Sequence, residues 1–256
     1  MKLWKDIGFE TEMTEDGSLS LRQLESVDPS KYKGESMHHS GGACAETLLI
    51  YGTPIREILQ KVIRPNFLIV GLGMGYIEMT IAREALLLGR RASDVGRITT
   101  YESLPELREY FYKWLHGYEN ELSSEVRKTY NSVLGSVLLG TGLSEGDLLD
   151  FLRAHFTQLD DLQGALTEDF KFVNRYHGIM YDAFSSKTTP FLWGEDFLFK
   201  VLHEGAAETC WFSTYACRVS LKNALQRAHF AITVRPGFVG KRNSTLGVRI
   251  SEKTLI

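Results

Sequence analysis

The sequence predicts a Rossmann-like α/β fold, with a mostly parallel, doubly wound sheet that ends in an antiparallel C-terminal strand. The apolar run FLIV at residues 67–70 is followed by a glycine-rich turn and then by apolar residues at helical spacing, which is the first βα unit of such a sheet. Further apolar strands alternate with helical segments toward the C-terminus. The tail, residues 230–251, is typical of two strands joined by a glycine-containing basic loop.

The composition is that of an ordinary globular protein with one large domain. Of the 256 residues, 43% are hydrophobic and 24% are charged, which excludes disordered and collagen-like classes. The start of the chain has no apolar run of signal-peptide length, and no stretch reaches the roughly 18 apolar residues of a membrane span, so we expect a cytoplasmic protein. The net charge of -3 gives no general attraction to polyanions, so a nucleic acid would need a local basic patch.

The first 60 residues are expected to form a small N-terminal extension of β-hairpin and helices, packed on the main domain. The segment around Asp16-Gly17 alternates weakly in polarity, and that dipeptide suits a hairpin turn. A loop and two short helices follow, the second of which has Pro54 at a plausible first helical position. We therefore divide the chain into an extension, 1–60, and a Rossmann-like domain, 61–256.

For the main domain, the sequence predicts alternating strands and helices, and it contains no linker and no internal repeat. Strands are expected at 96–103, 177–182 and 208–216. Helices are expected at 77–89, 105–118, 119–141, 144–156, 190–205 and 217–230.

The turn after the first strand carries Gly71, Gly73 and Gly75 and is the first candidate binding site. Glycines let a ligand approach the backbone at a helix N-terminus, although a purely structural tight turn has the same composition. The spacing G-x-G-x-G differs from the G-x-G-x-x-G of dinucleotide folds and favours a methyltransferase over a dehydrogenase. The sequence thus predicts the class I S-adenosylmethionine-dependent methyltransferase fold, with S-adenosyl-L-methionine as the cofactor.

Three carboxylates extend this candidate site, because ligands of open α/β sheets bind at the carboxyl ends of the strands. Glu102 ends the second strand and can accept hydrogen bonds from both ribose hydroxyls, or it is an exposed acid without a role. Asp147 can accept from the adenine amino group, or it is a helix N-cap. Asp182 ends the strand beside the first one and faces the same crevice, or it caps the next turn.

Other conspicuous residues have plainer interpretations. His38 and His39 lack partners at metal-ligand spacing, so we predict a loop and no metal site. The three cysteines match neither a disulfide framework nor a zinc site and are expected to be reduced; they are Cys44, Cys210 and Cys217. The cations Lys241 and Arg242 form a solvated loop or contact a phosphate.

In several ordered segments the sequence resembles the MnmC-like methyltransferases, which carry out the last methylation in forming 5-methylaminomethyl-2-thiouridine at the tRNA wobble position. The resemblance covers nearly the whole chain from about His38 onward. It rests on HHSGGACAETLLIYG, GLGMGYIEMT, YESLPEL, EGDLLDFL, YDAFSSKTTPFLW, STYACRVSLKNAL and GFVGKRNSTLG.

The resemblance implies roles for individual residues. Asp182 matches the family's proposed catalytic carboxylate, which would hold the substrate ammonium and then act as base. The implied cofactor-binding residues are Gly71, Gly73 and Gly75 for the methionine part, Glu102 for the ribose and Asp147 for the adenine. The implied substrate-binding residues are Phe184, Lys241 and Arg242, the last two on the anticodon backbone of tRNA.

The chain also departs from the family pattern. No segment is long enough for the flavin-dependent oxidase domain of bifunctional members, so we expect methylation alone, with a separate oxidoreductase partner for the amine substrate. Glu78 stands in the first helix where a small or amide residue is expected. Three functions remain open: methylation of the wobble uridine amine in tRNA, methylation of a small amine or another RNA, and a non-catalytic adenosine-ligand module.

Overall fold

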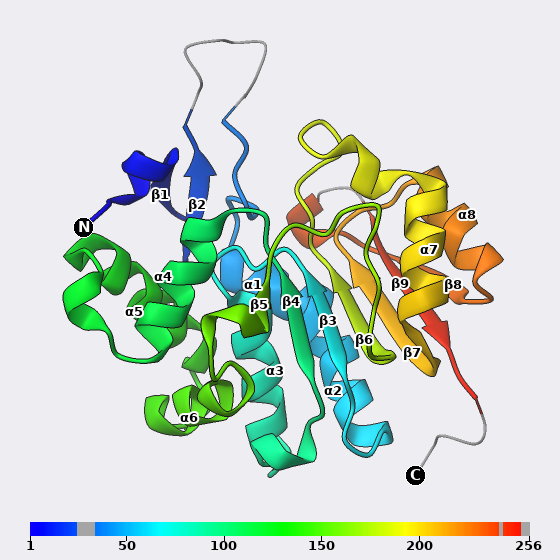
Figure 1. Ribbon diagram of the computed structural model, residues 1–256, viewed down its shortest axis with the longest axis horizontal. Helices are drawn as coiled ribbons and strands as arrows, with labels where there is room; N and C mark the ends of the chain where they lie inside the picture. Colours follow the sequence, from blue (N-terminus) through cyan, green and yellow to red (C-terminus); the bar gives the residue numbers. More distant parts are fainter. Residues whose placement is uncertain (25–33, 241–242, 252–256) are drawn as a thin grey trace.

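The computed structural model describes residues 1–24, 34–240 and 243–251, and its centre is a seven-stranded sheet with the order β5-β4-β3-β6-β7-β9-β8 (Figure 1). Neighbouring strands from β5 through β7 are parallel, whereas β9 runs antiparallel to both β7 and β8. The strands are β3 (Phe67–Val70), β4 (Ile98–Tyr101), β5 (Leu162–Gln163), β6 (Tyr176–Tyr181), β7 (Ala206–Thr214), β8 (Ala231–Arg235) and β9 (Ser244–Arg249). The predicted fold class is confirmed, including the antiparallel end of the sheet.

Helices cover both faces of the sheet (Figure 1). All four side chains of β3 are buried, so both faces of the sheet need a cover. Phe67 and Ile69 enter one hydrophobic core, while Leu68 and Val70 enter the other. The first core contains side chains of α2 (Thr53–Lys61), α3 (Tyr76–Leu87), α4 (Pro105–Leu115), α5 (Ser124–Leu138) and α6 (Glu145–His155). The second contains side chains of α7 (Glu195–Gly205) and α8 (Val219–Arg227).

The predicted hairpin is present and packs on the helical layer. Strands β1 (Phe9–Met13) and β2 (Leu19–Gln23) pair antiparallel. Just before them, the fully buried Trp4 donates a hydrogen bond from its indole Nε1 to Thr129 Oγ1 on α5 at 3.0 Å. After the hairpin, α1 (Ala43–Thr47), a π-helical turn (Leu48–Gly52) and α2 lead into β3. Helix α2 contacts α3 and β6, and the division of the chain at residue 60 stays a prediction.

Two predicted helices differ in extent. The helix expected at 119–141 begins only at Ser124, because the Ser123 Oγ accepts the Val126 amide at 3.2 Å and caps it there. The helix expected at 190–205 is split by Gly194, whose extended backbone separates a short 3₁₀ turn, Pro190–Trp193, from α7. Within the described residues, none of the helices combines the length and hydropathy that crossing a membrane requires.

Packing of β6 against β3 predicts the effect of a methyl group at Gly178. A Cβ atom there would lie 2.6 Å from a ring carbon of Phe67 and 2.9 Å from Ile58 Cδ1, both in the core. We expect Gly178→Ala to lower the free energy of unfolding by about 1–3 kcal/mol through overpacking, measured by urea denaturation. The matched control is Gly135→Ala on α5, where an added Cβ meets nothing within 4 Å and a gain of about 0.5–1 kcal/mol is expected. Equal effects of both substitutions would contradict the packing argument.

Candidate functional site

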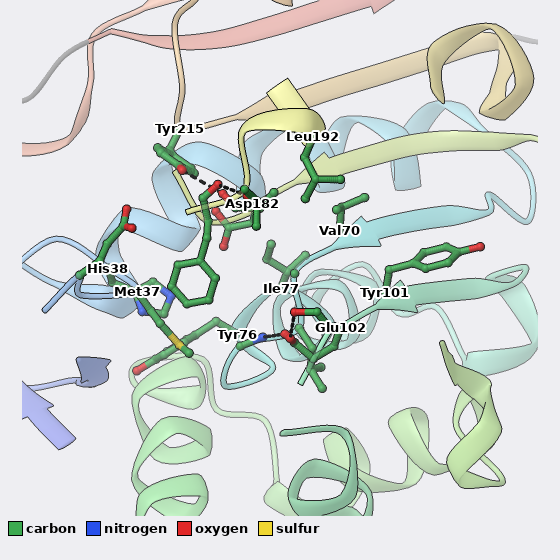
Figure 2. A pocket seen from close by; sticks show the side chains of 18 of the residues that line it. Met37, His38, Val70, Tyr76, Ile77, Tyr101, Glu102, Asp182, Leu192 and Tyr215 are labelled. Carbon is green, nitrogen blue, oxygen red and sulfur yellow. Dashed lines mark hydrogen bonds between the residues drawn. The ribbon is translucent and has the colours of Figure 1, made fainter. Parts of the chain in front are cut away.

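A cavity of about 260 Å³ lies where the carboxyl ends of the parallel strands meet (Figure 2). Its walls come from the residues that follow β3, β4, β5, β6 and β7, so the cavity lies at the edge of the sheet where the predicted strand-end residues meet. Segments 35–39 and 46–51 from the N-terminal part of the chain complete it. The site therefore needs the first 60 residues as well as the sheet.

The glycine turn is shaped by close backbone approach. Gly71, Gly73 and Gly75 have φ values of 100°, 52° and 75°, a region that favours glycine. A Cβ on Gly71 would lie 2.5 Å from the Asp182 carbonyl oxygen, and one on Gly75 would lie 2.3 Å from the Phe111 ring. The fold therefore requires glycine at Gly71 and Gly75, whether or not a ligand binds there. Gly71 and Gly73 line the cavity at the start of α3, whereas Gly75 does not.

Glu102 joins the end of β4 to the glycine turn. Its Oε2 accepts the Gly73 amide at 3.2 Å, and its Oε1 accepts the Leu104 amide at 2.9 Å. The side chain lines the cavity but is only 5% exposed, and this burial raises the pKa of the carboxyl despite the two backbone donors. Glu102 is therefore a buried acceptor at the cavity wall, not an exposed strand-end acid.

Asp182 lies in the cavity beside the glycine turn. Its amide continues the pairing of β6 with β3 by donating to the Val70 carbonyl at 2.8 Å. Its Oδ1 accepts a hydrogen bond from the Tyr51 hydroxyl at 2.6 Å. Among the described residues, no backbone amide of the next turn donates to this carboxylate, so the alternative role as a turn cap has no support. Burial raises the pKa of Asp182 to about 7, with a contribution from Glu46, against the Tyr51 hydrogen bond. A carboxyl with this pKa can exchange a proton at neutral pH.

Glu78 is a third carboxyl, behind the cavity wall on α3. The side chain is fully buried, its Oε1 accepts the Thr100 hydroxyl at 2.8 Å, and its Oε2 has no hydrogen-bond partner. Burial, together with the charges of Asp182 and Glu102, raises the pKa of Glu78 to about 8. The departure from the family pattern thus places a mostly protonated carboxylic acid in the interior, where the charges of Asp182 and Glu102 act on it.

The charge of the cavity selects for cations. The described residues that line it include four acids and neither a lysine nor an arginine; the acids are Glu35, Glu46, Glu102 and Asp182. His38 also lines the cavity, but burial lowers its pKa to about 4, so it is neutral at physiological pH. An anionic cavity with a glycine cradle fits S-adenosyl-L-methionine, which carries a sulfonium and an ammonium group.

Asp147 is not part of the cavity lining. It lies in the first turn of α6 with an exposed side chain, where its carboxylate accepts the Ser144 hydroxyl at 2.7 Å. Ser144, not Asp147, is the N-cap of this helix. At the end of β5 the cavity is lined instead by Ala165 and Leu166, so its wall there is apolar.

The predicted substrate residues divide into two groups. Phe184 lines the cavity two residues after Asp182, and Phe191 lies at its edge with 41% of its surface exposed. Lys241 and Arg242 lie outside the described residues. The residue Phe238, on the described flank of their loop, packs edge-on against His39, whose ring lies 5.6 Å away and belongs to the cavity wall.

Sequence reasoning missed the N-terminal contribution to the site. Tyr51 stands in an apolar helical run, LLIYG, so its pattern indicated only a core residue. Glu35 accepts hydrogen bonds from Ser185 and Thr188, which ties the N-terminal segment to the loop after β6. In the described part of the chain, no group of three potential metal ligands is present.

Comparison with known proteins decides the class of the site. Residues 153–250 match a family described as S-adenosyl-L-methionine-dependent methyltransferase. The fold is similar to that of MnmC2 from Aquifex aeolicus, with 22% identity, a TM-score of 0.56, and coverage of 96% of this chain and 73% of that one. By the family match the enzyme class is that of an S-adenosyl-L-methionine-dependent methyltransferase. The structural likeness supports the fold. The family match confirms the predicted cofactor, S-adenosyl-L-methionine, and together with the likeness to MnmC2 it agrees with the predicted resemblance to MnmC-like methyltransferases.

Two further solved structures are more distant from this methyltransferase. One is an O-methyltransferase from Thermotoga maritima, at 13% identity and a TM-score of 0.45, covering 95% of this chain and 86% of that one. The other is the tRNA (m1A58) methyltransferase TrmI from Aquifex aeolicus, at 13% identity and a TM-score of 0.37. The match covers 78% of this chain and 68% of that one.

The buried carboxyl of Glu78 predicts a pH-dependent stability. Its pKa rises from 4.5 to about 8 on folding, so between these values the folded state binds more protons and stability falls as pH rises. We expect the free energy of unfolding of Glu78→Gln, relative to that of the wild type, to rise by roughly 1.4 kcal/mol per pH unit between pH 5 and 8. Urea denaturation measures both values. Glu168→Gln, at an exposed glutamate, controls for loss of one charge. Parallel stability curves for wild type and Glu78→Gln would mean that Glu78 is ionised throughout.

Proposed function

We propose that this methyltransferase transfers the methyl group to the aminomethyl nitrogen of the modified wobble uridine in tRNA. The observation that carries the proposal is Asp182, a carboxyl with a pKa of about 7 in an anionic cavity beside the glycine turn. The sequence motifs shared with MnmC-like methyltransferases support the choice of amine. A cytoplasmic location and a separate oxidoreductase that supplies the amine are parts of the same proposal.

The residues that would hold the cofactor follow from the cavity wall. Gly71 and Gly73 leave room for the methionine part. Glu102 can accept a ribose hydroxyl, because a carboxylate has about four acceptor positions and the Gly73 amide, the Leu104 amide and the Ser103 hydroxyl use three of them. Ala165 and Leu166 offer an apolar wall to the adenine ring. The adenine role of Asp147 stays a prediction, without a cavity contact to support it.

The chemistry asked of the protein is modest. When bound, the cofactor supplies a methyl group already activated by the sulfonium. Asp182 would hold the substrate ammonium by charge and hydrogen bonding, take its proton, and so free the nitrogen lone pair for attack. Placing the amine in line with the methyl group is the remaining contribution, because orientation lowers the barrier of a bimolecular step.

Aromatic and basic groups at the cavity edge would hold the nucleoside. Phe184 and the exposed Phe191 are suited to stack on a base, which is how proteins commonly hold unpaired RNA bases. We assign phosphate contacts to Lys241 and Arg242, which follow Phe238 closely in the sequence. Phe238 itself packs on His39 of the cavity wall. A small amine remains the second candidate substrate, because the anionic lining favours a small cation.

Cofactor binding is predicted to depend on Glu102. Removal of its carboxylate takes away both the proposed ribose acceptor and the anchor of the Gly73 amide. We expect Glu102→Ala to raise the dissociation constant of S-adenosyl-L-methionine at least about tenfold, equivalent to 1.4 kcal/mol, in isothermal titration calorimetry. Glu168→Ala is the control and should bind as the wild type does. Unchanged affinity in Glu102→Ala would remove Glu102 from the cofactor site.

Methyl transfer to tRNA is predicted to depend on Asp182. With undermodified tRNA that carries the aminomethyl group and a methyl-labelled cofactor, nucleoside mass spectrometry should detect the methylated product. Asp182→Asn should lower the rate about 10²- to 10⁴-fold, the usual contribution of a general base, and leave cofactor affinity within about twofold. No product from tRNA, combined with methylation of small amines, would favour the second candidate and refute the tRNA proposal.

A further inference from the structure

Tyr51 is the hydrogen-bond donor to the Asp182 side chain. Its hydroxyl lies 2.6 Å from Asp182 Oδ1 and 3.5 Å from the Tyr181 carbonyl oxygen, and the residue is 2% exposed. Figure 2 shows Asp182 among the residues that line the cavity, with Tyr215 close by. Among the described residues, no second donor reaches this carboxylate. The Oδ2 atom is therefore the oxygen that remains for a ligand.

The backbone around Tyr51 is held by side chains from two strands of the sheet, β7 and β8. The residue belongs to the π-helical turn Leu48–Gly52, a local widening of a helix that is frequent at functional sites. Within this turn, the Ile50 carbonyl accepts hydrogen bonds from Ser213 Oγ on β7 at 2.6 Å and from Arg235 on β8 at 3.2 Å. Arg235 also donates to Ser213 Oγ at 2.9 Å, so the three groups support one another.

The charges around Asp182 make this single donor important. Glu46 on α1 acts on Asp182 and raises its pKa, and the charge of Asp182 in turn acts on Glu78 on α3 and on Tyr215 after β7. These neighbours are acidic or neutral, so they oppose ionisation of Asp182 or leave it unaided. The Tyr51 hydroxyl is the group that favours the charged form, because it donates to it.

We propose that Tyr51 is a positioning residue for Asp182: its hydroxyl holds Oδ1, directs Oδ2 toward the substrate ammonium and keeps the carboxylate ionised until it takes the proton. This inference rests on the proposed role of Asp182 as base. Ser213 and Arg235 act through Tyr51 by fixing the Ile50 carbonyl. The role of Tyr51 is therefore electrostatic and geometric, and it does not touch the reacting atoms.

Removal of the hydroxyl has a defined consequence for titration. Without it, burial and the acidic neighbours act on Asp182 unopposed, so the pKa of Asp182 rises further above its usual range. With a rise of about one pH unit, the ionised fraction at pH 7 falls about fivefold. At pH 9 the carboxylate is again mostly ionised, so activity recovers there.

The first experiment is a ¹³C NMR titration of the Asp182 carboxyl in the full-length chain, with its signal assigned by Asp182→Asn. We expect a midpoint about one pH unit higher in Tyr51→Phe than in the wild type. Tyr176→Phe is the matched control, because it removes a buried hydroxyl that binds Thr99 at the opposite end of β6. An unchanged midpoint in a folded Tyr51→Phe protein would overturn the proposal, whatever the substrate is.

The second experiment is the pH profile of kcat/KM for tRNA methylation. Tyr51→Phe should lose activity about fivefold at pH 7, move the acidic limb upward by about one pH unit and regain most activity at pH 9. A pH-independent loss would indicate a merely structural role and overturn the proposal. If the NMR midpoint shifts but the wild type does not methylate tRNA, the proposed substrate fails while the coupling of Tyr51 to Asp182 stands.

Ser213→Ala keeps the test valid if Tyr51→Phe does not fold. It removes one donor to the Ile50 carbonyl and leaves the phenol in place. We expect the Asp182 midpoint to shift in the same direction by less than one pH unit, and no further shift when Ser213→Ala is added to Tyr51→Phe. Additive shifts in the double variant would show that Ser213 does not act through Tyr51 and would overturn that part of the proposal.

Discussion

The parallel pairing of β3 with β6 is the constraint on which the rest of the site depends. In this register Val70 lies beside Tyr181, so the residues that follow, Gly71 and Asp182, are neighbours at the carboxyl edge of the sheet. The approach is so close that a Cβ on Gly71 would lie 2.5 Å from the Asp182 carbonyl oxygen. A glycine is thus required at Gly71 for the fold, and the same requirement opens the backbone to a ligand.

The electrostatics of the cavity follow from this arrangement. Glu102 follows β4 and Asp182 follows β6, and these two strands flank β3. The charges of both acids act on the buried Glu78 of α3. In the described lining no lysine or arginine compensates these acids, so burial keeps their pKa values high until a cation arrives. Binding a cationic cofactor and a cationic amine in one cavity is the use to which such a lining is suited.

The sequence was sufficient for the fold and for the strand-end residues, because both depend on local patterns. The run at Phe67–Val70 and its glycines identify a buried parallel strand, and the next residue after such a strand faces the binding edge. Tyr51 could not be found in this way, since only the tertiary contact with Asp182 distinguishes it from a core tyrosine. The adenine role of Asp147 stays a prediction, because the fold places this residue at an exposed helix start outside the cavity lining.

The most direct test of the account is a crystal structure of the protein with S-adenosylhomocysteine, the product of the cofactor. We expect the ligand to occupy the cavity, with its ribose within hydrogen-bond distance of Glu102, its adenine against Leu166 and its sulfur facing the side of Asp182. A ligand bound outside this cavity, or one whose sulfur faces away from Asp182, would contradict it.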